Sequence, residues 1–165
     1  MSKKLAIILV VAALILLWNT YSLYRDRFIP GAIAPEFSLQ DADGNIVALS
    51  DYKGSSVIVH FWATWCPTCA KEMPGLIKFQ KNNPDVVILA ISEDESFAEV
   101  NDFLGDDKNS IKVLLDKGEV VAGMYKSHRV PESYFINEEG IMVHAVNGRL
   151  DWDQGNLDEP ATDNL

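Results

Sequence analysis

The stretch that decides the fold is Phe61-Trp62-Ala63-Thr64-Trp65-Cys66-Pro67-Thr68-Cys69. It contains the only two cysteines of the chain, and two residues separate them. The apolar run over residues 56–62 leads into it, as expected for a central strand that is covered on both faces. Residues 67–81 have helical periodicity, so the two cysteines stand where a strand passes into a helix.

A Cys-x-x-Cys pair at the start of a helix is chemically asymmetric. The first sulfur faces free N–H groups and the positive end of the helix dipole, which lowers the pKa of Cys66. Pro67 suits the first helical position, where no N–H is needed. We therefore predict that Cys66 is exposed and forms a mixed disulfide with a partner, and that the more buried Cys69 resolves it. Trp62 and Trp65 are predicted to form an apolar rim around the pair.

Other roles for two cysteines fit this pattern less well. A zinc site needs about four ligands, and none of the three histidines falls at a finger-like spacing. A structural disulfide across two intervening residues would constrain almost nothing. Attachment of a c-type haem would need a histidine directly after Cys69, where Ala70 stands. We expect no metal and no cofactor other than a redox-active Cys66–Cys69 disulfide.

The rest of the chain predicts a mixed sheet with helices on both faces. Predicted strands cover residues 35–40, 46–49, 86–91, 111–115, 134–136 and 141–145, and predicted helices cover 95–104 and 119–125. Ser92-Glu93-Asp94 is predicted to cap the helix that Gly105 ends. The segment from Asp41 to Asn45 predicts a hairpin turn, because a calcium loop would need its glycine at the sixth position. The order of elements is hairpin, three alternating strands and helices, and hairpin, which is an α/β arrangement.

The first 25 residues predict a membrane anchor. Lys3 and Lys4 precede residues 5–24, which carry no charge, and about 20 such residues can span a bilayer as a helix. The alternative is a cleaved signal peptide, but the only suitable cleavage site, Ala32-Ile33-Ala34, lies well beyond the apolar core. With the two lysines cytoplasmic, the rest of the chain would lie on the periplasmic or extracytoplasmic side of the inner membrane, where disulfides persist.

Length and charge limit the remaining possibilities. The 165 residues allow one domain, and we predict an anchor over 1–25, a linker over 26–34, a domain over 35–152 and an acidic, disordered tail over 153–165. The short tail is expected to leave one face of the sheet less covered. The formal net charge of −10 disfavours nucleic acid as a partner.

At this point the motifs resemble the thioredoxin superfamily. The similar segments are Trp65-Cys66-Pro67-Thr68-Cys69, Pro35-Glu36-Phe37, Leu49-Ser50-Asp51-Tyr52-Lys53-Gly54 and Pro131-Glu132-Ser133-Tyr134-Phe135-Ile136-Asn137. They are similar to the membrane-anchored TlpA/ResA/CcmG(DsbE)-like branch over residues 35–152. The resemblance implies a thioredoxin fold with an N-terminal β-hairpin extension and the activity of a thiol–disulfide oxidoreductase. In this branch, a membrane-embedded thiol carrier usually supplies electrons that reduce disulfides in exported proteins such as apocytochrome c.

The resemblance also implies roles for single residues. Pro131 matches the family's cis-proline, which faces the dithiol and directs the Val130 backbone toward an incoming strand. Glu72, three residues after Cys69, matches an acidic residue that branch members use near the cysteines. His60 departs from the pattern, since thioredoxins carry aspartate there and this branch often has asparagine. It is either a proton relay to Cys69 or a neutral core residue.

Three competing functions remain at the level of sequence. The same chemistry can run as an oxidant or isomerase, since its direction depends on the reduction potential. A thiol peroxidase would need proline and threonine where Val59 and Ala63 stand. A copper-delivery module of this fold spaces its cysteines by three residues and adds a histidine, which disfavours that reading.

Overall fold

The computed structural model describes residues 3–25 and 30–153. The strands are β1 (Ser38–Asp41), β2 (Ile46–Ala48), β3 (Val57–Trp62), β4 (Val87–Ser92), β5 (Lys112–Leu115), β6 (Glu132–Ile136) and β7 (Met142–Asn147). The α-helices are α1 (Lys3–Arg25), α2 (Pro67–Asn82), α3 (Phe97–Leu104) and α4 (Val120–Tyr125), and the 3₁₀ helices are η1 (Leu49–Tyr52) and η2 (Gly105–Asn109). The predicted order of strands and helices is confirmed, with boundaries that differ by one or two residues at most ends and by three where β1 begins.

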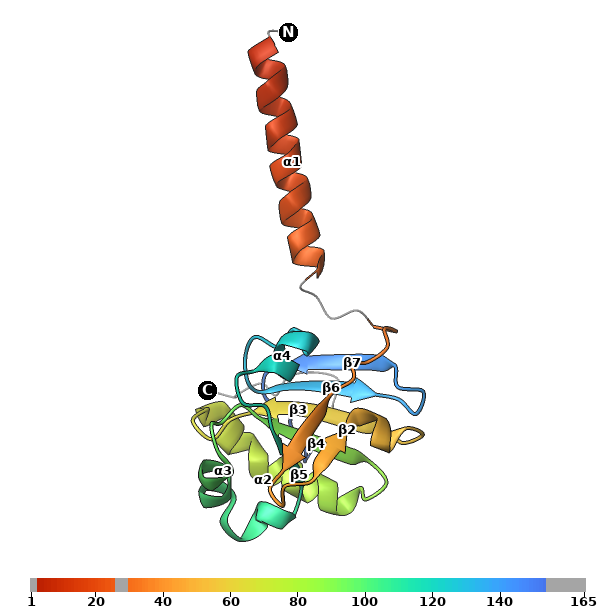
Figure 1. The fold of residues 1–165 in the computed structure, drawn as a ribbon, viewed down its shortest axis with the longest axis vertical. Coiled ribbons are helices and arrows are strands. Elements are labelled where there is room, and N and C mark those ends of the chain that lie inside the picture. Colours follow the sequence, from red (N-terminus) through yellow and green to blue (C-terminus); the bar gives the residue numbers. More distant parts are fainter. Residues whose placement is uncertain (1–2, 26–29, 154–165) are drawn as a thin grey trace.

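The seven strands form one mixed sheet in the order β2-β1-β5-β4-β3-β6-β7 (Figure 1). β3 pairs in parallel with β4, and β4 with β5, while the hairpins β1–β2 and β6–β7 join the sheet antiparallel. Parallel neighbours require crossover connections, which α2 and α3 provide. The strand that precedes the two cysteines therefore lies in the interior of the sheet.

All six residues of β3 are buried, as the continuous apolar run predicts. Successive side chains point to opposite faces. Ile58 and Trp62 belong to the buried cluster that contains the apolar residues of α2 and α3. Val59 and Phe61 belong to a second cluster, which contains the buried residues of α4 and Leu49 of η1. The prediction of helices on both faces is confirmed.

The start of α3 corrects one sequence prediction. Its N-cap is Ser96, whose backbone N–H donates to the Glu99 carboxylate at 3.0 Å. The predicted cap, Ser92-Glu93-Asp94, lies before the helix, and Ser92 and Asp94 are buried there. Ser96 and Glu99 form a capping box, so the helix begins with the expected kind of N-cap residue, but two residues later than predicted. Gly105 ends the helix with a φ of 53°, as predicted.

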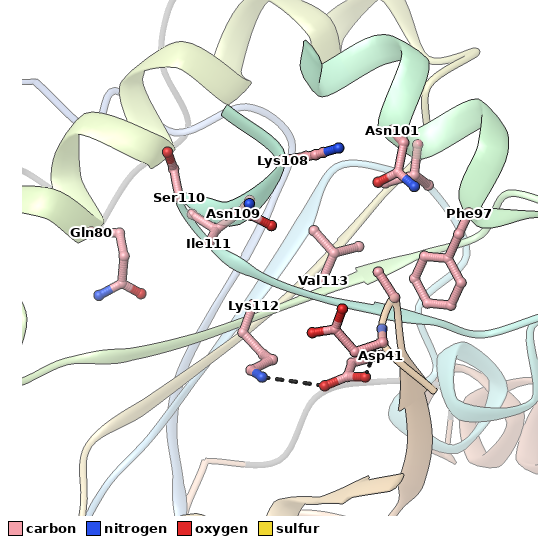
Figure 2. Close-up of a pocket in the computed structure, with 13 residues that line it drawn as sticks. Asp41, Gln80, Phe97, Asn101, Lys108, Asn109, Ser110, Ile111, Lys112 and Val113 are labelled. Carbon is pink, nitrogen blue, oxygen red and sulfur yellow. Dashed lines mark hydrogen bonds and ion pairs between the residues drawn. The ribbon is translucent and has the colours of Figure 1, made fainter. Parts of the chain in front are cut away.

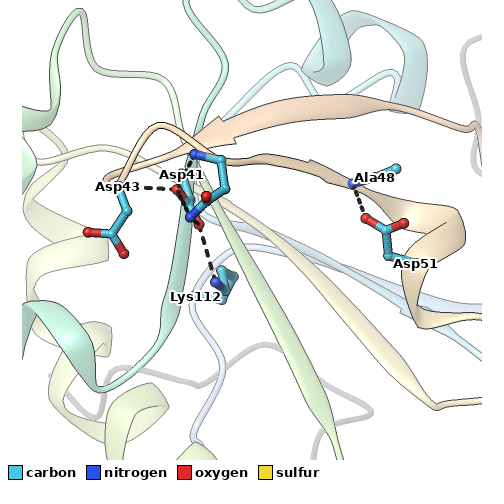
Figure 3. Close-up of polar contacts among 6 residues, drawn as sticks. Asp41, Asp43, Ala48, Asp51 and Lys112 are labelled. Carbon is cyan, nitrogen blue, oxygen red and sulfur yellow. Dashed lines mark hydrogen bonds and ion pairs between the residues drawn. The ribbon is translucent and has the colours of Figure 1, made fainter.

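The acidic turn between β1 and β2 is a hairpin turn, as predicted (Figure 3). Asp41 Oδ1 accepts hydrogen bonds from the backbone N–H groups of Asp43 at 3.0 Å and Asn45 at 2.9 Å. Asp41 Oδ2 lies 3.4 Å from Lys112 Nζ of β5. The carboxylate is therefore engaged by donors of the protein itself, which is the ordinary use of Asp in turns.

The N-terminal helix α1 covers the uncharged run that predicted a membrane anchor. Measured by length and hydropathy, none of the helices in residues 3–25 and 30–153 qualifies as one able to cross a membrane. The anchor over 1–25 and its orientation stay predictions. The first four residues of the predicted linker (26–29) and nearly all of the predicted tail (154–165) lie outside the described residues.

The residues after β7 pack on the face of the sheet that α2 covers. Leu150 is 1% exposed and Trp152 is 4% exposed, and both belong to the cluster beneath α2. The Trp152 ring centroid lies 5.2 Å from that of Phe79 on α2. Trp152 therefore fills part of the space between α2 and β3 on this face of the sheet. We call residues 148–153 the C-terminal strap.

Candidate active site

The two cysteines form a disulfide at the start of α2. Their Cα atoms are 5.3 Å apart. Cys66 is the N-cap of the helix, with Pro67 at its first position, and Cys66 Sγ accepts a hydrogen bond from the Cys69 backbone N–H at 3.1 Å. A donor and a helix dipole directed at Cys66 Sγ stabilise negative charge on that sulfur when the disulfide is reduced.

The observed burial of the two cysteines partly corrects the exposure predicted for them. Cys69 is 1% exposed and Cys66 is 5% exposed, so the predicted order holds. Cys66 is nevertheless much less exposed than predicted. Its Sγ is bonded to Cys69 and lies 3.6 Å from the carbonyl oxygen of Val130, a residue of the loop that precedes β6.

The structure brings Val130 and Pro131 to the dithiol, and the peptide bond between them is cis, as the resemblance implied. Pro131 directly precedes β6, which pairs with β3 beneath the cysteines. The pairing of β6 with β3 therefore fixes the position of the Val130–Pro131 loop relative to the dithiol.

The predicted aromatic rim is only half confirmed. The Trp65 side chain is 63% exposed beside Cys66. Trp62 is completely buried, and its ring packs 5.6 Å from that of Phe103 on α3. Trp62 is the last residue of β3, and the alternation of that strand points its side chain into the core. Because the surrounding sequence is continuously apolar, it gave no sign that this position is buried rather than exposed.

Glu72 lies on α2 one turn after Cys69 and is 2% exposed. Its Oε1 accepts from the Trp152 indole N–H at 2.6 Å and from the Leu150 backbone N–H at 3.2 Å. Burial raises the pKa of Glu72 to about 7, although both hydrogen bonds and the charge of Arg149 lower it. A carboxyl group with this pKa can accept or release a proton near neutral pH.

His60 is completely buried on β3, on the face that packs against α2. Its Nδ1 forms a hydrogen bond of 2.9 Å with Ser133 Oγ, and its ring meets that of Trp152 edge-on at 6.0 Å. Burial lowers the pKa of His60 to about 3. The imidazole is therefore neutral at physiological pH, which favours the core residue over the proton relay.

Asp94 is a site residue that the sequence reading missed. Its carboxylate accepts from the Thr64 backbone N–H at 3.0 Å, from Thr64 Oγ1 at 2.6 Å and from Ser92 Oγ at 2.7 Å. Thr64 is two residues before Cys66, so Asp94 braces the loop that carries the first cysteine. An acidic residue after a buried strand resembles a helix cap, and only the contact across 30 residues shows its use.

The same end of the sheet is acidic. Burial raises the pKa of Glu93 to about 7, and the neighbouring Glu119, Asp116, Glu132 and Asp94 raise it further. The Glu93 backbone N–H donates to the Trp62 carbonyl at 3.0 Å. These neighbouring carboxylates therefore oppose the ionisation of Glu93.

The two described cavities lie away from this chemistry. One, of about 380 Å³, lies between the β1–β2 turn, α3 and β5, and Figure 2 shows Asp41, Lys112 and Phe97 among its lining. The other, of about 310 Å³, is lined by residues around Ile33, Tyr52 and Ile141. None of the predicted site residues lines either of these two cavities.

Comparison with known proteins agrees with this geometry. Residues 30–145 match the family model described as "AhpC/TSA family". The thiol-disulfide oxidoreductase ResA of Bacillus subtilis is 32% identical over 146 residues, which are 87% of this chain and 82% of ResA. The thioredoxin-like protein YneN of the same organism is 33% identical over 132 residues, 76% of this chain and 77% of YneN.

A solved structure matches the fold as well. It is the crystal structure of a putative thiol:disulfide interchange protein DsbE from Chlorobium tepidum, with a TM-score of 0.71 and 26% identity. The match covers 78% of this chain and 92% of that chain. The predicted thioredoxin fold is confirmed. The chain belongs to the AhpC/TSA family and is a thiol–disulfide oxidoreductase with a thioredoxin-like fold.

Proposed function

We propose that this protein reduces disulfides in exported proteins, with Cys66 as the attacking cysteine and Cys69 as the resolving one. The observation that carries the proposal is the position of Cys66 Sγ. It accepts a hydrogen bond from the Cys69 N–H at the start of α2 and lies 3.6 Å from the Val130 carbonyl. The first contact stabilises a thiolate, and the second places that sulfur beside a backbone acceptor with which an extended client can pair.

The reaction balances as two thiol–disulfide exchanges. The Cys66 thiolate attacks one sulfur of the client disulfide, forming a mixed disulfide, and the other client sulfur leaves as a thiolate that takes up a proton. Cys69 then gives its proton to the Glu72 carboxylate and attacks Cys66 Sγ. This step forms the Cys66–Cys69 disulfide and releases the second client sulfur as a thiolate, which takes up a proton. Two electrons pass to the client, and a membrane thiol donor returns them to the dithiol.

Trp65 is proposed to contact the client, because its side chain is 63% exposed beside Cys66. Val130 and Pro131 are proposed to bind the client backbone. We assign His60 no titrating role. No cofactor beyond the dithiol is proposed. Apocytochrome c is the proposed client, on the strength of the family resemblance and of the similarity to proteins named ResA and DsbE.

A direct assay tests the reductive direction. The full chain, purified in mild detergent, should reduce an oxidised apocytochrome peptide and insulin with dithiothreitol as electron source, and Cys66→Ala should abolish this activity. Reoxidation of reduced, unfolded ribonuclease that is faster than reduction of the peptide would assign the protein as an oxidant. Tightly retained metal without exchange activity would assign it as a metal-binding module.

We also propose attachment to the inner membrane, with the dithiol on the extracytoplasmic side. The support is in the sequence: Lys3 and Lys4 precede 20 uncharged residues, 5–24. Alkaline carbonate should leave the chain in the membrane pellet, and protease added to spheroplasts should digest residues 35–152. Release by carbonate, or protection from the protease, would contradict the proposal.

A further inference from the structure

The C-terminal strap connects three parts of the candidate active site. The Gly148 N–H donates to the carbonyl of Pro131 at 2.9 Å. Two residues later the Leu150 N–H donates to Glu72 Oε1, and two residues beyond that the Trp152 indole N–H donates to the same oxygen at 2.6 Å. The strap therefore joins the loop that faces the dithiol to the buried carboxyl group behind it.

Packing fixes the Trp152 ring in place. The ring lies against Phe79 of α2 on one side and meets His60 of β3 edge-on. The Cβ of Trp152 also approaches α2 closely at Gly75, where an added methyl group would stand 3.5 Å from it. With 4% of its surface exposed, the indole has little freedom to leave Glu72.

The two oxygens of Glu72 have different surroundings. Oε1 takes both strap donors, whereas Oε2 is buried and has no hydrogen-bond partner within the described part of the chain. Residues three apart on a helix are neighbours, with Cβ atoms about 5–6 Å apart. Cys69 and Glu72 are such a pair, so a proton can pass between the Cys69 thiol and Glu72 directly or through one water.

We propose that Trp152 is a positioning residue for thiol–disulfide exchange: with Leu150, it holds Glu72 by Oε1 and leaves Oε2 as the oxygen that exchanges a proton with Cys69. The inference rests on the proposed function, since deprotonation of Cys69 is a step of that exchange. It adds a residue from a strap that is 80 positions away from Glu72 along the sequence.

The charges around Glu72 agree with this role. Burial raises the pKa of Glu72 to about 7, and the Trp152 hydrogen bond is the largest of the influences that lower it. Arg149 of the strap also lowers it, and His60 of β3, behind the indole, is neutral at this pH. On α2 itself, Cys69 lies one turn before Glu72 and is joined to the N-cap residue Cys66 as a disulfide in this structure, and Lys71 and Lys78 are exposed.

The first test uses Trp152→Phe, which keeps an aromatic ring against Phe79 and His60 but removes the N–H donor. A hydrogen bond to a charged group lost in this way should raise the pKa of Glu72 by about one unit. The ¹³C carboxyl resonance of Glu72, assigned by its loss in Glu72→Gln, should therefore titrate about one pH unit higher. The acidic limb of the pH profile for peptide reduction should move by the same amount, with up to about tenfold slower reduction below pH 6.

Two controls separate positioning from packing. Phe79→Leu loosens the packing of the indole without removing the donor and should leave the Glu72 midpoint within about 0.3 unit of the wild type. In a Glu72→Gln background, Trp152→Phe should no longer move the pH profile. An unchanged Glu72 midpoint in folded Trp152→Phe, or an equal shift of the profile in the Glu72→Gln background, would overturn the inference.

A measurement on the unmodified chain covers the case in which Trp152→Phe does not fold. The ¹⁵N-indole N–H resonance of Trp152 should titrate with the midpoint of Glu72, near pH 7, and lose this dependence in Glu72→Gln. An indole resonance that does not change between pH 5 and 9 would contradict the inference. These spectra do not depend on turnover, so failure of the proposed reductase activity would be seen separately.

Discussion

From the burial of Glu72 we predict how the free energy of unfolding depends on pH. In an unfolded chain the pKa of this carboxyl group is 4.5, and in the folded protein burial raises it to about 7. The folded state therefore binds more protons than the unfolded state between these pH values. Stability is greatest below pH 4.5 with respect to this group and falls as the pH rises through 7. A difference of about 2.5 pKa units corresponds to about 3 kcal/mol.

Glu72→Gln isolates this contribution, because glutamine keeps an oxygen for the Trp152 N–H but cannot ionise. The variant should gain stability relative to the wild type as the pH rises, by about 3 kcal/mol between pH 4 and pH 8.5. The two added amide hydrogens shift the difference by a constant and leave its pH dependence unchanged.

Urea unfolding of the oxidised full chain at six pH values between 4 and 9 measures this difference, since both cysteines are then unable to titrate. Glu139→Gln, which removes a carboxylate from an exposed position, is the matched control and should show no comparable growth. Parallel pH dependences for Glu72→Gln and the wild type would refute the assignment of Glu72 as a buried, neutral-pH acid.

Three further changes have defined outcomes. His60→Asn should leave the midpoints of the pH profile for disulfide reduction unmoved, because the pKa of His60 is about 3; a displaced midpoint would return the histidine to the mechanism. Leu76→Ala, at a completely buried position of α2, should lower the free energy of unfolding by about 2–5 kcal/mol, and a loss below about 1 kcal/mol in urea would contradict the packing described. Glu93→Gln should stabilise the protein relative to the wild type more at pH 8 than at pH 5, since burial and four neighbouring carboxylates raise the pKa of Glu93. Thermal unfolding temperatures equal to those of the wild type at both pH values would count against this repulsion.

Local sequence patterns predicted most of the fold because its central elements are locally determined. The apolar run of β3, the Pro67 start of α2 and the glycine that ends α3 each carry their own signal. The dithiol could be predicted in the same way, because the Cys-x-x-Cys spacing and its strand-to-helix setting lie within nine residues. The cis bond before Pro131 came from the family resemblance rather than from any local pattern.

The missed features depend on contacts between distant parts of the chain. The hydrogen bond from Trp152 to Glu72 joins residues 80 positions apart, and that from Thr64 to Asp94 joins residues 30 apart. Neither contact leaves a hydrophobic pattern in a short segment of the sequence from which it could be predicted. A tryptophan in an otherwise acidic segment, Asp151-Trp152-Asp153, was the one available signal, because so large an apolar side chain is seldom left in water without a function.

The central claim is that Cys66 bonds the client and Cys69 resolves it, and trapping tests it most directly. Cys69→Ala, expressed as the full chain in its own cells, should accumulate client proteins in mixed disulfides with Cys66. Mass spectrometry of the cross-linked peptides should identify Cys66 as the linked residue, and dithiothreitol should release the clients. Cys66→Ala, the matched control, should capture none. Clients trapped on Cys69 in Cys66→Ala, with none in Cys69→Ala, would reverse the two roles and contradict the account.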